Sequence, residues 1–321
     1  MSCGIGAKSW NRAAAEVCLE MGEALVGSES APHTPVLLDE VLEWLDVKPE
    51  GIYIDATLGA GGHSAAIAAR LLSGRLISLD RDAQALVLAA ERLKSFAATV
   101  TLVPSSFSRI AEVVHELGIP GVDGVLADLG VSSMQLDQAA RGFSFREAGP
   151  LDMRMSAEDD LTADEIVNRW SEEDIADTLY QGAEEHDSRR IARAIVRARP
   201  IRDTAHLATV VAGARKQWGR QRLHPATKTF LALRIAVNRE MEALGQFLSR
   251  TPATLNTGGR LVVLSYHSGE DRLVKHAFQD GERQGMLKVL TRHVIQPNER
   301  EVSANPRSRS AKLRCAEKVQ G

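Results

Sequence analysis

The fold is decided by the glycine-rich stretch Asp55-Ala-Thr-Leu-Gly59-Ala-Gly61-Gly62-His63-Ser64. An apolar run at 51–54 precedes it, and alanine- and leucine-rich sequence with helical spacing follows at 65–72. This order predicts a strand, a tight turn and a helix. Glycines in such a turn let a ligand approach the backbone and expose amide hydrogens at the helix start. The stretch therefore predicts a ligand at this strand end, although a tight turn that binds nothing would show the same pattern.

Acidic residues end three of the predicted strands. The apolar runs 51–55, 76–80 and 122–128 finish with Asp55, Asp80 and Asp128. Helical spacing at 82–95 and 110–117, with a short strand at 100–103, completes a βαβ alternation, which predicts a parallel sheet with helices on both faces. Ligands bind such sheets at the carboxyl ends of the strands, where an acid such as Asp80 suits the two hydroxyls of a ribose.

The turn distinguishes between two classes of nucleotide. A dinucleotide fingerprint needs Gly-x-Gly-x-x-Gly, and here Ser64 replaces the third glycine. The carboxylate of Asp55 would also repel a pyrophosphate. S-adenosylmethionine carries a sulfonium and an amino group, and a positively charged ligand tolerates that acid. The residues therefore favour S-adenosylmethionine as the cofactor, with a nicotinamide oxidoreductase as the rival.

Composition limits the class of protein. The 321 residues are 44% hydrophobic and 25% charged, which is typical of a globular protein of one large or two smaller domains. With 4% aromatic residues and a net charge of -3, RNA contacts would have to come from local basic clusters. No apolar run approaches the length of a membrane span, and residues 1–31 lack the apolar segment of a secretory signal. We therefore expect a cytoplasmic protein with no membrane partner.

The three cysteines lie near the ends of the chain, at Cys3, Cys18 and Cys315. Their odd number and the absence of metal-ligand spacing indicate a reducing compartment and no bound metal. None lies in a motif, so the sequence offers no thiol nucleophile.

The alternation of strands and helices stops after residue 137. Helical spacing then runs through 162–170, 171–182, 187–199 and 204–218, followed by a long predicted helix at 224–249 and a strand at 258–265. Thr162 and Ser171 each precede an acid three positions later, as in a capping box. We therefore expect an N-terminal extension at 1–31, an α/β domain at 32–137 and 223–321, and an all-helical domain inserted at 138–222.

Several motifs carry the residue types of a reactive site. Asp128 begins a polar segment that reaches Gln135, where a carboxylate can accept a proton from an amine, although a plain polar turn is the alternative. The irregular segment 141–155 combines arginine with phenylalanine and can wrap a base and its phosphate, unless it is an ordinary connector. His267, after the strand at 258–265, could form a substrate rim. A hydrolytic triad is excluded because no Gly-x-Ser-x-Gly turn is present.

Basic residues gather on one predicted helix. Arg189, Arg193 and Arg197 stand four positions apart and share one face, which suits phosphate contacts. A solvated charged face is the alternative, but further basic stretches at 215–222 and 307–314 favour RNA.

Together these blocks resemble the RsmH family, also called MraW, the bacterial 16S rRNA (cytosine-N4)-methyltransferases. The matching blocks cover nearly the whole chain after residue 31, at 33–40, 55–64, 79–82, 128–137, 141–155, 224–230, 265–272 and 305–314. The resemblance implies an S-adenosylmethionine-dependent enzyme, with a Rossmann-like methyltransferase domain and an inserted helical substrate-recognition domain. It also implies that the substrate is one cytosine in the decoding region of the small-subunit rRNA.

Site residues follow from the matching motifs. The cofactor residues implied are Gly61, Gly62, His63, Asp80 on the ribose, Phe107 on the adenine, Asp128 and Gln135. The substrate residues expected are Arg141, Phe143, Phe145, Arg154, Arg193, Arg197, His224, Lys228, Asn238 and His267. The exocyclic amine would attack the methyl group directly, with Asp128 or a nearby backbone carbonyl as the proton acceptor.

The implied partner is 16S rRNA in the small ribosomal subunit, and a homodimer is left open. Two further alternatives remain at this point: a methyltransferase-fold protein that binds RNA without catalysis, and a methyltransferase that acts on another nucleic-acid amine. Labelled cofactor and small subunits would separate them.

Overall fold

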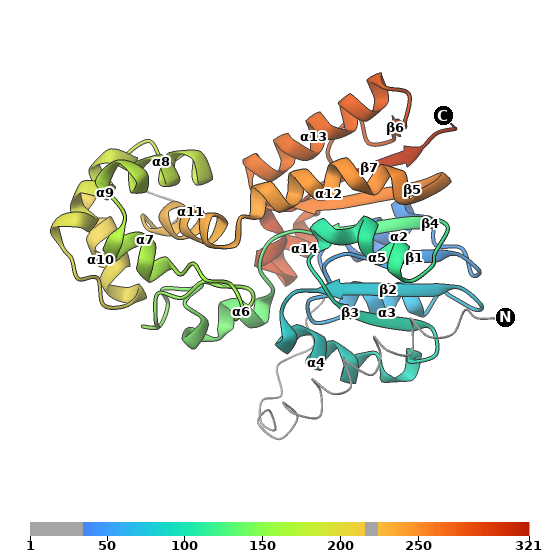
Figure 1. Cartoon of the computed structure of the whole chain (residues 1–321), viewed down its shortest axis with the longest axis horizontal. Helices are drawn as coiled ribbons and strands as arrows, with labels where there is room; N and C mark the ends of the chain where they lie inside the picture. Colours follow the sequence, from blue (N-terminus) through green and yellow to red (C-terminus); the bar gives the residue numbers. More distant parts are fainter. Residues whose placement is uncertain (1–34, 216–223, 321) are drawn as a thin grey trace. The chain divides into compact units, whose positions relative to one another are not determined.

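The computed structural model describes residues 35–215 and 224–320. The chain divides into two compact units (Figure 1). We call Met1–Gly130 with Glu242–Gly321 the sheet unit, and Val131–Met241 the helical unit. The N-terminal extension predicted at 1–31 lies outside the described residues.

Seven strands form one sheet within the described residues, in the order β3-β2-β1-β4-β5-β7-β6. The strands are β1 (Ile52–Asp55), β2 (Arg75–Asp80), β3 (Val100–Pro104), β4 (Val122–Asp128), β5 (Leu255–Ser265), β6 (Leu287–Val289) and β7 (Lys312–Lys318). β1 to β5 pair in parallel, and β7 runs antiparallel to both β5 and β6. The carboxyl ends of β1, β2, β4 and β5 therefore meet at one edge, as the strand-ending acids predicted.

Side chains of the sheet alternate between two apolar cores, one on each face. Tyr53 and Leu126 belong to the core under α2, α3 and α4, whereas Ile54 and Val125 belong to the core under α5, α12 and α13. Because both faces are covered, the central strands β1 and β4 are mostly buried along their length. The helices of the sheet unit are α2 (Leu38–Leu45), α3 (Gly62–Ala68), α4 (Ala83–Arg92), α5 (Ile110–Glu116), α12 (Glu240–Thr254), α13 (Ser268–Arg283) and α14 (Glu299–Ala304), with short 3-10 turns η2 (Lys94–Phe96), η3 (Phe107–Arg109) and η5 (Pro306–Ser310).

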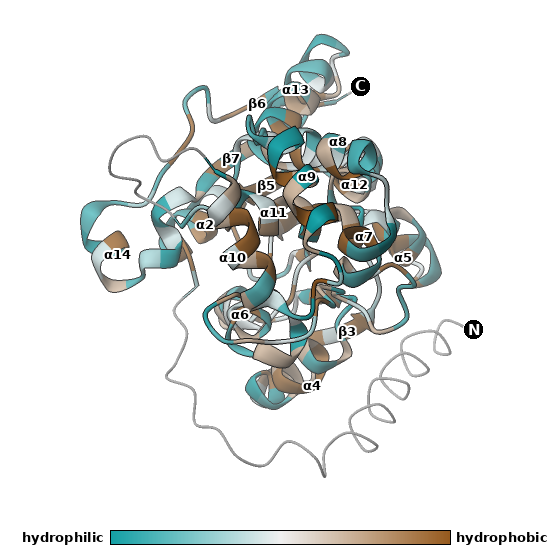
Figure 2. Ribbon diagram, turned by 90° about the vertical axis from the view of Figure 1, so that its left-hand side faces the viewer, coloured by the Kyte–Doolittle hydropathy of each residue, from teal (hydrophilic) through white to brown (hydrophobic). Residues whose placement is uncertain are grey.

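The helical unit packs its helices around a third apolar core. Its helices are α6 (Ser133–Asp137), α7 (Ala163–Arg169), α8 (Glu172–Ala183), α9 (Ser188–Arg197), α10 (Thr204–Ala214) and α11 (Thr227–Asn238), with the 3-10 turn η4 (Ala139–Arg141). The expected caps are present, since Thr162 accepts from the N–H of Glu165 and Ser171 from that of Asp174. Figure 2 shows α10 as mostly apolar, whereas α9 alternates between charged and apolar residues, because one face of α9 is exposed.

The long helix predicted at 224–249 is wrong: α11 ends at Asn238 and α12 begins at Glu240. Arg239 adopts a left-handed backbone conformation with φ 49° and caps α11. The guanidinium of Arg234 binds both carboxylate oxygens of Glu240 across the break, at 2.9 and 2.8 Å. A non-glycine residue rarely adopts this conformation, so nothing in the sequence marks the break.

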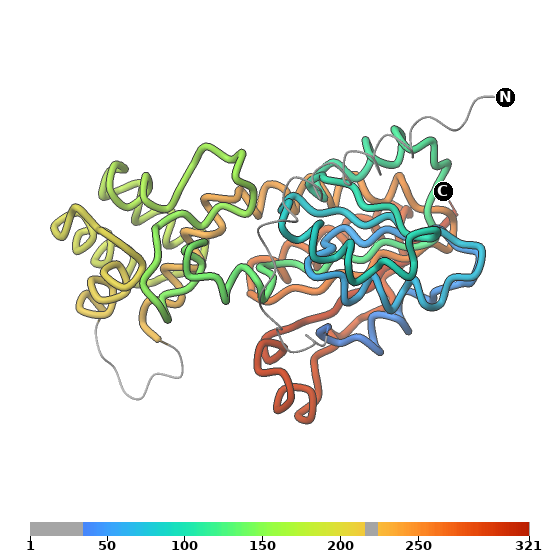
Figure 3. The backbone as a smooth tube through the Cα atoms, turned by 90° about the horizontal axis from the view of Figure 1, so that it is seen from below, coloured from blue at the N-terminus to red at the C-terminus, as the bar shows by residue number. Residues whose placement is uncertain are grey.

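The boundaries of the helical unit also differ from the predicted insertion at 138–222. The unit runs from 131 to 241. It includes α6 at its start and α11 at its end, because apolar residues of both helices pack in the helical core. The C-terminal segment, which the sequence marked only by its basic stretch at 307–314, contains β7 next to β5, as the red and orange segments in Figure 3 show. β7 alternates charged and apolar residues because it is only half buried. Its sequence therefore lacks the apolar run by which the other strands were predicted.

Candidate active site

Asp55 holds the turn after β1 in shape. Its side chain is almost completely buried, at 1% exposed. Oδ2 accepts from Ser64 Oγ at 2.6 Å and Oδ1 from the backbone N–H of Thr57 at 3.1 Å. Burial raises the pKa of Asp55, although these donors oppose the rise. Because both oxygens of Asp55 are bound within the turn, this residue organises the site rather than contacting a ligand.

Asp80, at the end of β2, is a partly exposed carboxylate. Oδ2 accepts from the N–H of Gly59 at 2.8 Å and Oδ1 from the N–H of Asp82 at 2.8 Å. Burial raises the pKa of Asp80 to about 6, against these two donors. Each carboxylate oxygen has a further lone pair, so Asp80 can accept from two ligand hydroxyls while it fixes the glycine turn.

Asp128, at the end of β4, is held by three neighbours and keeps a side chain that is 24% exposed. Its backbone N–H donates to Thr57 Oγ1 at 2.6 Å, and Oδ1 accepts from the hydroxyl of Tyr266 at 2.7 Å. Oδ2 lies 3.5 Å from His63 Nδ1, and His63 Nε2 lies 3.0 Å from the carbonyl oxygen of Val36. Burial raises the pKa of Asp128, whereas His63 and the Tyr266 hydroxyl counteract the rise.

The segment after β5 is fixed by a buried acid. Glu270 accepts from the N–H of Tyr266 at 2.8 Å and from that of His267 at 3.3 Å. His267 caps α13, and its Nδ1 accepts from the N–H of Glu270 at 3.4 Å. His267 Nε2 lies 3.2 Å from Glu270 Oε1 and is buried without a well-formed hydrogen bond. The predicted rim residue His267 thus serves first as a helix cap.

Part of the basic stretch 307–314 is also used inside the sheet unit. Asp271 binds Arg314 at 2.7 Å and Lys312 at 3.2 Å. Both cations hold the pKa of Asp271 below its usual range. These two residues join β7 to α13, so their charges are compensated within the fold.

The glycines of the turn are required for packing. Gly61 has φ 76°, and a Cβ there would lie 3.2 Å from Ala89 Cβ of α4. A Cβ on Gly62 would lie 2.6 Å from Pro35 Cγ. The turn therefore lies tightly against its neighbours. Phe107, after β3, sets its ring edge-on to Phe247 with centroids 5.4 Å apart and stays partly exposed.

Gln135 lies in the helical unit. Its side chain accepts from the N–H of Ser132 at 3.0 Å, and Ser132 Oγ accepts from the N–H of Gln135 at 3.3 Å. The pair forms a capping box that starts α6. Gln135 therefore fixes the start of α6.

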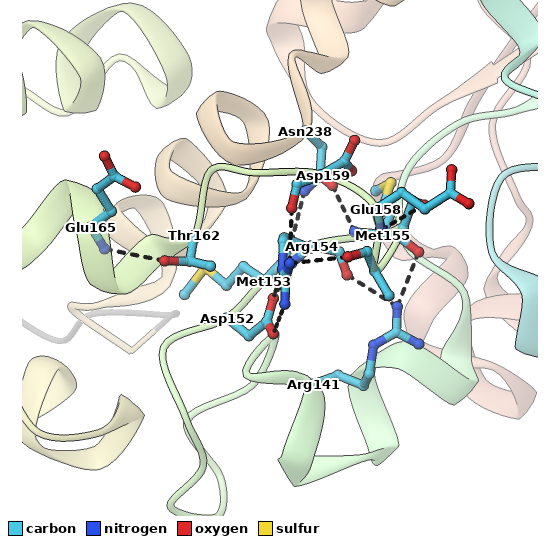
Figure 4. A network of polar contacts seen from close by, with 12 residues as sticks. Arg141, Asp152, Met153, Arg154, Met155, Glu158, Asp159, Thr162, Glu165 and Asn238 are labelled. Carbon is cyan, nitrogen blue, oxygen red and sulfur yellow. Dashed lines mark hydrogen bonds and ion pairs between the residues drawn. The ribbon is translucent and has the colours of Figure 1, made fainter.

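The arginines of the 141–155 segment bind the segment itself (Figure 4). Arg141 Nη2 donates to the carbonyl oxygens of Arg154 at 3.0 Å and Met155 at 3.1 Å. Arg154 binds both carboxylate oxygens of Asp152, at 2.8 and 3.0 Å, and donates to two further backbone carbonyls. An irregular segment needs donors for its carbonyl groups, and the two arginines supply them.

Asn238 closes the same network from α11 (Figure 4). Its Oδ1 accepts from the N–H of Met155 at 2.7 Å, and its Nδ2 donates to the carbonyls of Met153 and Arg234, both at 2.8 Å. The side chain is 3% exposed. Asn238 is therefore placed as a structural anchor of the segment, not on the surface.

We expect Asn238→Ala to lower the free energy of unfolding of the helical unit by about 2–4 kcal/mol, because the N–H of Met155 and the buried carbonyl of Met153 lose their partner. Urea unfolding followed by circular dichroism measures this loss. An unchanged unfolding midpoint together with weaker RNA binding would mean that Asn238 contacts substrate instead.

Aromatic residues line a shallow groove in the helical unit. Phe143 is buried in the core, and the guanidinium of Arg141 lies 5.8 Å from its ring centroid. Phe145 contacts the rings of His224 and Phe230, with centroids 4.7 and 4.8 Å away. Phe145 and His224 form one wall of the groove, and small residues of α10 form the other. Of the three predicted substrate rings Phe143, Phe145 and His224, only Phe145 and His224 are accessible.

The arginine face of α9 is exposed, as predicted. Arg193 and Arg197 both point to solvent, while Ile191 and Ile195 are buried. Arg193 forms a surface ion pair with Glu172 at 3.2 Å, and Arg197 has no ion-pair or hydrogen-bond partner among the residues that the structure describes. Lys228, in contrast, donates to the carbonyl of residue 184 at 3.0 Å and caps α8.

Comparison with known proteins decides the family. A family model described as the MraW methylase family matches residues 30–319. The ribosomal RNA small subunit methyltransferase H of Koribacter versatilis is 50% identical over 300 residues, which cover 90% of this chain and 95% of that protein. The protein of the same name from Acidobacterium capsulatum is also 50% identical over 300 residues, covering 90% and 99%. The chain belongs to the MraW methylase family. The resemblance seen in the sequence is thereby confirmed.

The sheet unit and the helical unit are the α/β domain and the helical domain that the resemblance to the MraW family implied. Among solved structures, an rRNA methylase from Streptococcus thermophilus is similar with a TM-score of 0.39 and 15% identity, covering 88% of this chain and 94% of that chain. A likeness this weak says nothing about the function of the chain.

Two residues of this MraW-family site were missed in the sequence. Tyr266 reaches Asp128 because β5 pairs with β4 in parallel, with Leu264 opposite Asp128. Thr57 holds the backbone of Asp128 from the turn. The available signal was position: Tyr266 directly follows a predicted strand, and the acids are the last residues of theirs.

The described residues contain no cluster of side chains suited to a metal ion. The absence of a metal stays a prediction. No helix in the described part of the chain has the length and apolar character needed to cross a membrane.

Proposed function

We propose that this MraW-family protein transfers a methyl group from S-adenosylmethionine to the exocyclic N4 amine of one cytosine in the decoding region of 16S rRNA. Family membership supports a methyltransferase, and the relatives' shared name gives small-subunit ribosomal RNA as what they methylate. The observation that carries the proposal is the pair of partly exposed carboxylates, Asp80 and Asp128, at the ends of β2 and β4.

The residues present fit S-adenosylmethionine. Asp80 has lone pairs left for the two ribose hydroxyls after it binds the N–H groups of Gly59 and Asp82. Three acids at neighbouring strand ends suit a ligand that carries positive charge. Phe107 supplies an accessible apolar ring at the end of β3 for the adenine. From the family motifs, the remaining cofactor residues proposed are Gly61, Gly62, His63 and Gln135.

Asp128 is the proposed proton acceptor. When bound, S-adenosylmethionine supplies a methyl group made electrophilic by its sulfonium. The cytosine amine is a weak nucleophile because its lone pair is conjugated with the ring, so an acceptor must take its proton as the new bond forms. Among the residues that the structure describes, Asp128 Oδ2 has only the 3.5 Å contact with His63, whereas Oδ1 accepts from the hydroxyl of Tyr266. Because burial raises the pKa of Asp128, its carboxylate is a stronger base than an exposed one.

The helical unit is proposed to bind the RNA. The exposed face of α9 offers arginines to phosphates, and Phe145 and His224 offer ring surfaces to a base. Arg141, Phe143, Arg154, Lys228 and Asn238 are proposed to act by holding this surface in shape, and His267 remains a proposed rim residue. The remaining proposals are the small ribosomal subunit as partner, a cytoplasmic location and the absence of a metal. The oligomeric state is left open between a monomer and a homodimer.

We expect the double charge reversal Arg193→Glu with Arg197→Glu to weaken RNA binding at least tenfold while cofactor affinity is unchanged. Because each arginine would neutralise one phosphate of a single strand, the slope of log affinity against log salt should also become shallower by about 1.4. Filter binding at several salt concentrations measures both effects. Arg283→Glu, an exposed arginine of α13, is the matched control and should leave the affinity and the slope unchanged.

The direct test incubates purified protein with S-adenosylmethionine labelled in the methyl group and with small subunits that lack the modification. The expected result is about one labelled methyl group per 16S rRNA. Cofactor binding without transfer would favour an RNA-binding protein that has lost activity, and tight binding of a reduced nicotinamide would favour the oxidoreductase.

A further inference from the structure

Tyr266 stands in a position that the proposed reaction does not yet use. Its hydroxyl donates to Asp128 Oδ1 at 2.7 Å, and its backbone N–H is fixed by buried Glu270 at 2.8 Å. Tyr266 is therefore held at both ends, by α13 and by the end of β4. A phenol fixed in this way acts as a rigid hydrogen-bond donor.

We propose that Tyr266 is a positioning residue for methyl transfer: its hydroxyl binds Asp128 Oδ1, fixes the carboxylate, and favours Oδ2, which lacks this donor, as the oxygen that accepts the amine proton. This inference rests on the proposed function. The backbone of Asp128 is already fixed by Thr57, so the hydroxyl of Tyr266 restricts the remaining rotation of the carboxylate. An acceptor with one fixed orientation needs no rearrangement when the proton arrives.

Four groups face the Asp128 carboxylate from the surrounding elements. His63 of α3 and Tyr266 favour its ionised form, whereas Asp55 of β1 and Glu270 of α13 oppose it. Burial beside Asp128, Glu270 and Glu301 raises the pKa of Tyr266 well above 10, so Tyr266 stays a donor across the working pH range. Removing the hydroxyl takes away one group that favours the carboxylate, and so the pKa of Asp128 must rise.

The test compares wild type with Tyr266→Phe, which keeps the ring and removes the hydroxyl. The expected result is a kcat lower by about tenfold, an acidic limb of the kcat profile displaced to higher pH, and an unchanged dissociation constant for S-adenosylmethionine. Tyr53→Phe is the matched control. It removes a hydroxyl that binds the backbone of residues 46 and 48 at the other end of β1, and the acidic limb should not move.

Two further measurements make the outcome decisive. In an Asp128→Asn background, Tyr266→Phe should cause no additional loss of kcat, because the two residues act as one unit. Carbon-13 spectra of labelled aspartate, assigned by difference with Asp128→Asn, should show the Asp128 carboxyl titrating at higher pH in Tyr266→Phe. This titration is independent of activity, so it tests the effect of Tyr266 on Asp128 separately from methyl transfer, whose absence in wild type would refute the proposed function. An unmoved Asp128 titration and acidic limb would overturn the role of Tyr266.

Discussion

Asp80→Asn is expected to weaken S-adenosylmethionine binding by a hundredfold or more. Asparagine retains one acceptor oxygen in place of two and loses the charge, so both ribose hydrogen bonds are weakened. Hydrogen bonds to a charged group are each worth about 1.5–3 kcal/mol, and two of them account for at least this loss. Isothermal titration calorimetry of the cofactor measures it directly.

Asp82→Asn is the matched control for this change. Asp82 lies two positions further along, is buried, and caps α4 by accepting from the N–H of Gln84. Asparagine caps helices as well as aspartate does, so the control should bind the cofactor almost normally. Wild-type affinity in Asp80→Asn would remove Asp80 from the cofactor site.

The raised pKa of Asp80 gives binding and stability opposite dependences on pH. The pKa is about 6 in the fold against an ordinary value of 3.8, because burial disfavours the carboxylate. For an acid with a raised pKa, the ionised form costs stability above pH 6, and this cost disappears as the pH falls toward 4. Cofactor affinity should fall over the same interval, because a protonated carboxyl accepts fewer hydrogen bonds. Both dependences should be absent in Asp80→Asn.

Asp128→Asn is expected to lower kcat by a factor of about 10² to 10⁴, the usual range for a lost general base. The asparagine amide keeps the shape of the side chain but cannot take up a proton from the cytosine amine. Cofactor affinity should change by less than about tenfold, because Asp80 and the turn remain intact. Single-turnover methyl transfer to small ribosomal subunits separates the chemical step from binding.

Asp123→Asn provides the comparison for Asp128→Asn. Asp123 lies on the same strand at its opposite end, where it accepts from the N–H of Ile52 and from Asn256. The substitution should affect stability slightly and leave kcat unchanged. If Asp128→Asn retained wild-type kcat, a backbone carbonyl or water would have to accept the proton.

The strand-end acids were predictable because two simple patterns coincide at them. Three of the parallel strands, β1, β2 and β4, are largely apolar runs, and they stop at Asp55, Asp80 and Asp128. The carboxyl ends of parallel strands share an edge, so the site could be located without knowing any side-chain contact. Which acid is buried and which is accessible depends on packing, and only the structure distinguishes Asp55 from Asp80.

The sequence predicted that the helical unit is built from helices. It did not predict which groups the arginine and asparagine side chains of the unit would bind. Arg141, Arg154 and Asn238 have the chemistry of RNA-binding residues, yet each donates to backbone carbonyls of the helical unit. Sequence cannot show which carbonyls lack partners, because that depends on the path of the irregular segment. In contrast, the α9 arginines follow from helical periodicity alone, so their exposure was foreseen.

Direct attack by an exocyclic amine is the central claim, and the identity of the methylated nucleoside tests it most directly. Small-subunit RNA treated with the purified protein and S-adenosylmethionine is digested to nucleosides and analysed by mass spectrometry against synthetic standards. We predict N4-methylcytidine from one position, absent when the Asp128→Asn variant is used in place of wild type. Finding 5-methylcytidine, which requires attack by a cysteine thiolate on the ring, or no methylated cytidine at all, would contradict the claim.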